Sequence, residues 1–199
     1  MTGLTPVDVI VLAGGEGRRM GGQDKGLVAF RSQPMAGFAV QLVRPYARRL
    51  IISCNRHLPE YSDLADQVVM DELAGFQGPL AGILSGLRVC HTDQVLVLPC
   101  DTPLLQAALI ERLLLAAQAK PDAITVLSEG DELHPLHAVI PRRLVADLST
   151  WLEGGQRAVQ RWMRCHPMQL IDIVDAADQL CNLNTEQALR VAEKSLLNN

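Results

Sequence analysis

Along the chain, short apolar runs alternate with longer stretches in which hydrophobic residues recur at helical spacing. Apolar runs typical of buried β-strands recur at 7–13, 50–54, 67–70, 95–99, 123–127, 137–140 and 170–174. The runs 9–12 and 95–98 are apolar throughout, which favours strands that are covered on both faces of a sheet.

The stretches between these runs predict helices. Pro34 suits the first turn of one helix, and Pro79 suits the first turn of another. Leucines at helical spacing begin at Leu105 and end near Pro121, where proline stops a third helix. The remaining helices are expected later in the chain, over 141–152, over roughly 156–165, and from Thr185 onwards as an amphipathic helix.

Strand, helix and strand in succession predict right-handed βαβ units and a mainly parallel sheet. The turn signal Ser-Glu-Gly-Asp at 128–131 joins two strand-like segments, so one antiparallel excursion is expected. We find no repeat, low-complexity run or linker. The sequence therefore predicts a single α/β domain over 1–199, with three α/β/α layers and a Rossmann-like, mostly parallel sheet.

Composition and charge narrow the classes of partner. The chain of 199 residues is 48% hydrophobic and 20% charged, with a formal net charge of −4. Proteins that bind long nucleic acid usually carry a basic stripe, and none is visible here. We therefore expect no nucleic-acid partner, and any phosphates that the protein handles should belong to a small molecule.

Targeting signals and cysteines indicate the compartment. The apolar run near the N-terminus lacks a basic segment before it, and no stretch reaches the ~18 apolar residues that span a bilayer. We expect no membrane association. The five cysteines form no CxxC pair, which favours small buried side chains in a reducing compartment. The expected location is the cytoplasm.

The segment 12–25 is the first candidate for chemistry, because ligands of open α/β sheets bind beyond the carboxyl ends of strands. Glycines at 14, 15, 17, 21 and 22 allow backbone N–H groups to approach an anion. Arg19 and Lys25 add positive charge that can pair with phosphate oxygens. A flexible surface loop is the alternative, but it would not predict an arginine and a lysine held after a buried strand.

Two better-known glycine motifs do not fit this segment. A Walker A loop requires Ser or Thr after its lysine, whereas Gly26 follows Lys25. The dinucleotide fingerprint GxGxxG would place a third glycine where Met20 stands.

Asp101 is the second candidate, because an apolar strand delivers this carboxylate at its carboxyl end and Pro103 then stiffens the exit. A carboxylate in this position suits Mg²⁺, which prefers a few carboxylates together with waters and substrate phosphates. The alternative is that Asp101 caps the following helix. A phosphate-type loop in the same topology favours the magnesium interpretation.

Further polar residues fall at other strand ends. Asp71 follows the run 67–70, glycines at 78 and 82 open a helix, and the amides of Asn182 and Asn184 face one way on an extended backbone. Each alone is an ordinary turn residue. His134 and His137 have a spacing that could bind metal, although no third ligand is apparent.

Together these segments resemble the nucleotidyltransferases with the signature LAGGxxxRMGxDK, and among them the molybdenum cofactor guanylyltransferases. The signature matches 12–15, 19–21 and 24–26, when one extra residue is allowed at 22–23. The other family motifs match in order, GPLAG at 78–82, PCDTP at 99–103 and NxNTPE at 182–185, and 55–57 is similar to its NRH. The resemblance covers essentially the whole chain and implies the fold of the nucleotide-diphospho-sugar transferases.

The resemblance also implies two groups of site residues. GTP is expected to contact Leu12, Ala13, Gly14, Lys25, Ser53, Asp71 and Asp101, with Asp101 also holding Mg²⁺. The molybdopterin side is expected to include Gly15, Gly22, Gly82, Arg157, Asn182 and Asn184. The family commonly has Asn where this chain has Ser53, and serine cannot make the paired contacts of an amide. The sequence leaves open whether Ser53 or Asn55 contacts the nucleotide.

The activity that follows from the resemblance is transfer of GMP from GTP to the terminal phosphate of molybdopterin, with release of pyrophosphate. The attacking phosphate is already anionic, so Arg19, Lys25 and Mg²⁺ on Asp101 would stabilise charge without a general base. Molybdopterin-synthesising proteins and molybdoenzymes are expected as transient partners. A cytidylyl- or sugar-phosphate nucleotidyltransferase is one alternative, and a non-catalytic nucleotide-binding regulatory domain is another.

Overall fold

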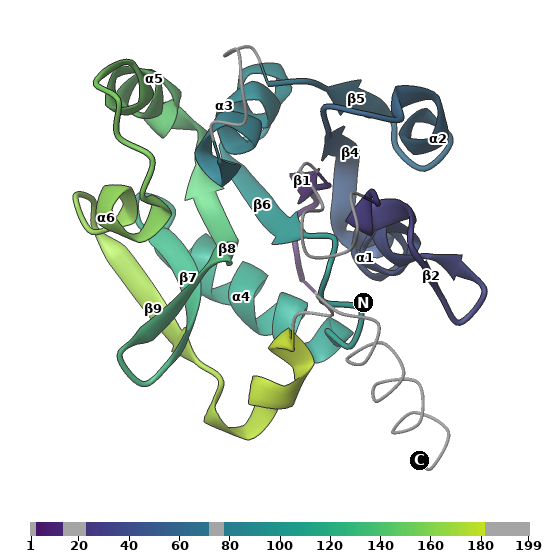
Figure 1. The fold of residues 1–199 in the computed structure, drawn as a ribbon. Helices are drawn as coiled ribbons and strands as arrows, with labels where there is room; N and C mark the ends of the chain where they lie inside the picture. The colour runs from purple at the N-terminus through teal and green to yellow at the C-terminus, as the bar shows by residue number, and fades with distance from the viewer. Residues whose placement is uncertain (1–2, 14–22, 72–77, 182–199) are drawn as a thin grey trace.

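The computed structural model describes residues 3–13, 23–71 and 78–181, and its central feature is a seven-stranded sheet (Figure 1). The strand order is β5-β4-β1-β6-β8-β7-β9. The strands are β1 (Val7–Leu12), β4 (Ala47–Ser53), β5 (Gln67–Val69), β6 (Gln94–Pro99), β7 (Ile124–Glu129), β8 (Glu132–Pro141) and β9 (Met168–Asp172). A separate two-stranded sheet joins β2 (Ala29–Phe30) to β3 (Gln33–Pro34).

Among the described strands of the large sheet, β8 alone runs against its neighbours, which confirms the single antiparallel excursion. It pairs antiparallel with β6 and β7, whereas the pairs β5–β4, β4–β1, β1–β6 and β7–β9 are parallel. The hairpin between β7 and β8 turns at Gly130, whose φ of 56° lies in the left-handed region that glycine adopts without strain.

Helices cover both faces of the sheet and make the three expected layers (Figure 1). One face packs against α1 (Met35–Val43) and α4 (Ala107–Ala119), and α2 (Leu58–Ser62) adds to the same core. The other face packs against α3 (Pro79–Val89), α5 (Val145–Glu153) and α6 (Val159–Met163). Strand β1 is buried along its whole length because its side chains alternate between these two cores.

Several predicted boundaries differ from the observed ones. Pro34 ends β3 and precedes α1, so its prediction within the first turn of the helix is wrong, whereas Pro79 does open α3. The helix predicted from Leu105 begins two residues later. The strand predicted over 170–174 is β9 at 168–172, because the 3₁₀ helix η5 (Val174–Leu180) begins at the position where that strand was expected to end.

The predicted helices near the C-terminus also change. The segment 141–152 divides into the 3₁₀ helix η4 (Arg142–Leu144) and α5, and α6 is shorter than the predicted 156–165. The helix predicted from Thr185 lies outside the described residues. Within the described part of the chain, no helix has both the length and the apolar character that a membrane crossing requires.

The cysteines are free thiols, and three of them are buried as expected. The prediction of burial is wrong for Cys165 and Cys181, which are exposed: Cys165 lies in the turn after α6, and Cys181 follows η5. Burial raises the pKa of Cys54 to about 11, and it raises the pKa of Cys100 well above that of an ordinary thiol. These two thiols therefore stay protonated and pack as small apolar groups.

Candidate active site

The carboxyl ends of neighbouring parallel strands lie together at one end of the sheet. Leu12 at the end of β1 pairs in register with Ser53 on β4 and with Pro99 on β6. The alignment continues one residue further, where Ala13 N–H donates to the Ser53 carbonyl at 2.9 Å and Cys100 N–H donates to the Leu12 carbonyl at 3.1 Å. Parallel pairing therefore brings the predicted residues of distant segments to one place, as expected for an open α/β sheet.

An ion pair joins two of the residues that are predicted to carry catalysis. Lys25 Nζ lies 2.7 Å from Asp101 Oδ2, and the two side chains are 27% and 16% exposed. Lys25 opens the 3₁₀ helix η2 (Lys25–Leu27), and Asp101 follows β6. Helix α4 begins at Ala107 after the N-cap residue Gln106, so Asp101 does not cap it. The alternative of a merely capping aspartate is therefore excluded for α4.

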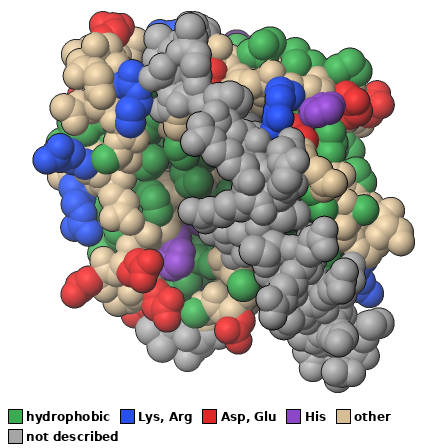
Figure 2. All heavy atoms as spheres, in the orientation of Figure 1, with side chains coloured by type: hydrophobic (Ala, Val, Ile, Leu, Met, Phe, Trp, Pro, Cys, Tyr) green, Lys and Arg blue, Asp and Glu red, His purple; other side chains and the backbone are tan. Residues whose placement is uncertain are grey.

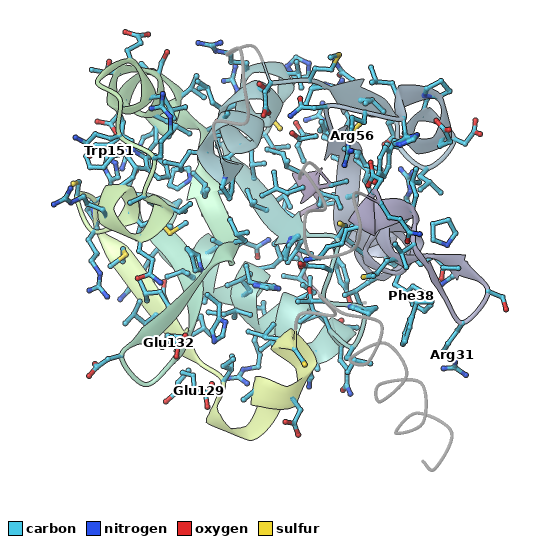
Figure 3. The ribbon with its side chains drawn as sticks, viewed as in Figure 1. Arg31, Phe38, Arg56, Glu129, Glu132 and Trp151 are labelled. Carbon is cyan, nitrogen blue, oxygen red and sulfur yellow. The ribbon has the colours of Figure 1, made fainter. Side chains whose placement is uncertain are left out.

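Asp71 is held by Asn55, a partner that the sequence alone does not identify. Asn55 Nδ2 donates to Asp71 Oδ2 at 2.8 Å, and the Asp71 N–H donates to Asn55 Oδ1 at 2.9 Å. Burial raises the pKa of Asp71 above the usual range, while the hydrogen bond from Asn55 lowers it. Asn55 therefore fixes the carboxylate in orientation and favours its ionised form. Arg56, the next residue, lies near the same end of the sheet (Figure 3).

Ser53 packs against α3 at Gly82. A Cβ atom at Gly82 would lie 2.6 Å from Ser53 Oγ and 3.2 Å from Leu12 Cδ2. Both distances are shorter than a comfortable carbon contact, so glycine at this position lets α3 approach the strand ends. The structure thus brings Leu12, Ser53 and Gly82 together and separates the contacts of Ser53 from those of Asn55.

His137 supports the turn that carries Asp101. Its Nε2 lies 3.1 Å from Thr102 Oγ1, and the side chain is 4% exposed. Burial, followed by the nearby ring of His134, lowers the pKa of His137 to about 3, so the imidazole is neutral at physiological pH. Among the described residues, no group of His, Cys, Asp or Glu could by itself hold a metal ion. The spacing of the two histidines therefore serves packing and hydrogen bonding.

Arg157 lies in the loop between α5 and α6. Its Nη1 donates to the carbonyls of Leu152 and Gln156, both at 2.8 Å, and these bonds hold the guanidinium at the end of α5. Basic side chains gather along this side of the molecule, whereas acidic side chains gather at the tip of the β7–β8 hairpin near Glu129 and Glu132 (Figures 2 and 3). The other predicted site residues lie outside the described part of the chain: Gly14, Gly15, Arg19, Gly22, Asn182 and Asn184.

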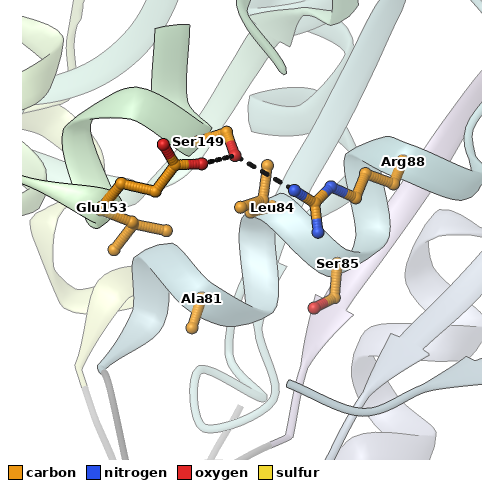
Figure 4. Close-up of a pocket in the computed structure, with 7 residues that line it drawn as sticks. Ala81, Leu84, Ser85, Arg88, Ser149 and Glu153 are labelled. Carbon is orange, nitrogen blue, oxygen red and sulfur yellow. Dashed lines mark hydrogen bonds between the residues drawn. The ribbon is translucent and has the colours of Figure 1, made fainter. Parts of the chain in front are cut away.

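A cavity of about 180 Å³ lies between α3 and α5, on the helical layer beside the sheet. It is lined by Ala81, Leu84, Ser85, Arg88, Ser149, Leu152 and Glu153 (Figure 4). Arg88 Nη2 donates to Ser149 Oγ at 3.1 Å, and Ser149 Oγ donates to Glu153 Oε1 at 3.0 Å. Since none of the predicted site residues that the structure describes lines it, this cavity is separate from the strand ends that carry Lys25 and Asp101.

The donor set at the strand ends fits Mg²⁺ when a phosphate ligand is also present. Asp101 offers one carboxylate that is partly accessible, and Lys25 contacts its Oδ2 atom. Magnesium is usually bound by one or two carboxylates together with waters and substrate phosphates, and not by a complete cage of protein ligands. A single carboxylate beside a lysine therefore suits a metal that arrives with a nucleotide.

Comparisons with known proteins identify the family of the chain. The sequence model of the MobA-like NTP transferase domain matches residues 9–170. A molybdenum cofactor guanylyltransferase from Ectopseudomonas mendocina (strain ymp) is 44% identical over 191 residues, which are 96% of this chain and 93% of that protein. One from Shewanella sediminis (strain HAW-EB3) is 35% identical over 188 residues, which are 94% of this chain and 96% of that protein.

Solved structures show the same fold at low sequence identity. The crystal structure of molybdopterin-guanine dinucleotide biosynthesis protein A from Archaeoglobus fulgidus has a TM-score of 0.80 and 21% identity, covering 96% of this chain and all of that one. A 2-C-methyl-D-erythritol 4-phosphate cytidylyltransferase from Thermus thermophilus has a TM-score of 0.69 and 17% identity, covering 98% of this chain and all of that one. The fold is therefore common to proteins with different substrates.

Proposed function

The chain belongs to the family of MobA-like NTP transferase domains, and from this premise we propose that it is a molybdenum cofactor guanylyltransferase. In the proposed reaction, GMP passes from GTP to the terminal phosphate of molybdopterin, and the product is the guanine dinucleotide form of the cofactor. The observation that carries the proposal is the Lys25–Asp101 pair beside the carboxyl end of β6. Curated relatives that match nearly the whole chain support the choice of substrates.

The chemistry requires positioned positive charge more than proton transfer. A phosphate oxygen of molybdopterin attacks the α-phosphorus of GTP, the bond from that phosphorus to the β-phosphate oxygen breaks, and pyrophosphate leaves with the bonding electrons. The nucleophile is already an anion, so the main obstacle is the repulsion between two polyanions. Lys25, already oriented by Asp101, offers an ammonium group at the site of this charge.

Asp101 is the residue that would hold Mg²⁺ in this site, because its carboxylate stands where the nucleotide phosphates are expected. When bound, the metal ion would neutralise phosphate charge during the transfer. Arg19, in the glycine-rich segment, is proposed to add further positive charge. Two cationic side chains and one metal-binding carboxylate would then surround the reacting phosphates.

The remaining residues divide between the two substrates in the proposal. Leu12, Ala13, Gly14 and Ser53 contact the nucleotide, and Asp71 accepts hydrogen bonds from it through the carboxylate that Asn55 orients. Guanine carries adjacent N–H donors on one edge, and an ionised carboxylate is an acceptor of matching chemistry. The molybdopterin side comprises Gly15, Gly22, Gly82, Arg157, Asn182 and Asn184.

Release of pyrophosphate tests the proposal. Purified protein with GTP, Mg²⁺ and molybdopterin should release pyrophosphate, and omission of molybdopterin or addition of EDTA should abolish the signal. Comparison of GTP with CTP, UTP and dTTP separates a guanylyltransferase from a cytidylyl- or sugar-phosphate transferase. A GTP-dependent rise in melting temperature without pyrophosphate release would instead indicate a non-catalytic nucleotide-binding domain.

The proposed substrates also suggest protein partners and a cellular location. A cofactor that passes from one protein to the next requires brief contacts with molybdopterin-synthesising proteins and with molybdoenzymes. Such contacts, and a cytoplasmic location, are part of the proposal. Binding of the purified chain to an immobilised molybdoenzyme, measured with and without GTP, would test the first of them.

A further inference from the structure

We propose that Tyr61 is a positioning residue for Lys25, and that its hydroxyl acts through Asp24 to fix the turn that presents the Lys25 ammonium group. The inference rests on the proposed function, in which Lys25 pairs with substrate phosphates. Tyr61 belongs to none of the motifs that identify the site from the sequence, and it lies on α2.

The first observation is the contact between Tyr61 and Asp24. The Tyr61 side chain is fully buried, and its hydroxyl donates to Asp24 Oδ1 across 37 positions of sequence. Burial and the hydrogen bond to Asp24 raise the pKa of Tyr61 well above its ordinary value. The phenol therefore keeps its proton and remains a donor at neutral pH.

The second observation is that Asp24 joins Tyr61 to the turn that contains Lys25. Asp24 is 9% exposed and is the N-cap residue of η2. The same atom that accepts from Tyr61, Oδ1, accepts from the Gly26 N–H at 3.1 Å. A buried carboxylate is tolerated when hydrogen bonds satisfy it, so the tyrosine hydroxyl and the turn N–H stabilise Asp24 together. Loss of either donor would loosen the residue that precedes Lys25.

The third observation is steric. A Cβ atom at Gly26 would overlap the Tyr61 hydroxyl and would lie 3.1 Å from its Cζ. Gly26 itself is buried, so the turn packs directly on the tyrosine ring with no space for a side chain. Tyr61 thus sets both the hydrogen bonding and the distance of the turn, and Lys25 Nζ reaches Asp101 Oδ2 at 2.7 Å from this fixed backbone.

The main test replaces only the hydroxyl. Tyr61→Phe should lower kcat for pyrophosphate release by on the order of 10-fold, because displacement of a reacting group by ~1 Å can cost as much as 10²-fold. In a Lys25→Ala background, the same substitution should cause no further loss, since its effect passes through Lys25. Equal losses of kcat in both backgrounds would overturn the proposal, as would a Tyr61→Phe variant that melts lower but keeps its kcat.

Substitutions at Asp24 and Gly26 probe the same contact. Asp24→Asn keeps an acceptor oxygen and should retain most activity, whereas Asp24→Ala should behave like Tyr61→Phe. Gly26→Ala should be damaging, and Tyr61→Phe in the same chain should partly restore its kcat because the overlapping hydroxyl is gone. Tyr46→Phe is the matched control. The Tyr46 hydroxyl donates to Glu111 on α4, so its removal should leave kcat unchanged.

Crystal structures separate this inference from the proposed function. If the wild-type protein releases no pyrophosphate, the proposed function fails. The position of Lys25 can still be measured in crystals of the wild type and of Tyr61→Phe. A longer or lost Lys25–Asp101 contact in the variant supports the inference, and a contact that stays near 2.7 Å overturns it.

Discussion

Lys25 Nζ and Asp101 Oδ2 lie 2.7 Å apart although 76 positions of sequence separate the two residues. Lys25 opens η2 and Asp101 lies two residues beyond the end of β6, so the contact joins two elements that are distant in the sequence. Each side chain holds the other in place, so a change at one position alters the geometry at both. The pair is also partly exposed, and its contribution to folding should therefore be small compared with its contribution to catalysis.

Asp101→Asn should remove turnover and leave the fold intact. The substitution keeps the shape of the side chain but removes the charge that binds Lys25 and would bind Mg²⁺, so pyrophosphate release should fall by on the order of 10²-fold or more. The melting temperature should stay close to that of the wild type. Asp122→Asn, at an exposed partner of Arg143, is the control and should change neither quantity. Near-normal turnover in Asp101→Asn would show that the carboxylate has no catalytic role.

Gly82→Ala should destabilise the protein and, because its methyl group would displace Ser53 and Leu12 on the nucleotide side, also weaken nucleotide binding. The new methyl group would lie 2.6 Å from Ser53 Oγ, and overpacking of this kind typically costs ~1–3 kcal/mol. Ser53→Ala in the same chain should recover part of the loss by removing that oxygen. Denaturant unfolding and GTP titration measure the two effects.

Gly86→Ala is the matched control, one turn further along α3. Its methyl group would meet Ile10 Cδ1 at 2.6 Å, in the core away from the strand ends. It should therefore reduce the free energy of unfolding but leave the affinity of the folded protein for GTP unchanged. Equal losses of affinity in the two variants would argue against a local effect of Gly82 on the nucleotide site.

Asn55→Ala should make GTP binding more sensitive to acid. Burial already raises the pKa of Asp71, and the hydrogen bond from Asn55 opposes that rise, so its removal should raise the pKa further. At mildly acidic pH a larger fraction of Asp71 would be neutral, and affinity should begin to fall at a higher pH than in the wild type. Titration calorimetry with GTP over a pH series measures this shift. Gln41→Ala removes a surface amide bonded to Gln33 and should leave the profile unchanged.

His137 should make folding stability depend on pH. Its pKa is lowered to about 3 in the folded protein, compared with about 6.5 in an unfolded chain. Between these values the unfolded state binds the extra proton, so stability falls as the pH decreases from 6.5 toward 3, by about 2 kcal/mol at pH 5 for this group alone. In His137→Gln the free energy of unfolding should decline less between pH 6.5 and pH 3. Urea unfolding at pH 7 and pH 5 would measure it, and identical declines in the two proteins would contradict a buried neutral histidine.

The sequence predicts the layered fold and the end of the sheet that carries the candidate site, because few arrangements of strands and helices satisfy the observed patterns. Wholly apolar runs require a sheet covered on both faces, and parallel βαβ units require that the strands end together. These two constraints place Asp71 and Asp101 at the same end of the sheet. The register of Leu12 with Ser53 and Pro99 confirms that the strands end together.

The supporting contacts could not be predicted, because they depend on side-chain packing between distant elements. Nothing in the spacing of Asn55 and Asp71 indicates a reciprocal amide–carboxylate pair, and the spacing of His137 suggests only a metal site shared with His134. Tyr61 belongs to no sequence motif. At the edge strand β9, partial burial leaves the apolar pattern weak, which is why its predicted end was wrong.

The reversed strand β8 has a consequence for the growing polypeptide. The four strands β5, β4, β1 and β6 and the described nucleotide-side residues are complete by residue 101, but β6 gains its second neighbour only when β8 has been synthesised through residue 141. During this interval the apolar edge of β6 can pair with another chain, as unprotected strand edges do. The arrival of β8 therefore ends the period in which the edge of β6 is open on the nascent chain.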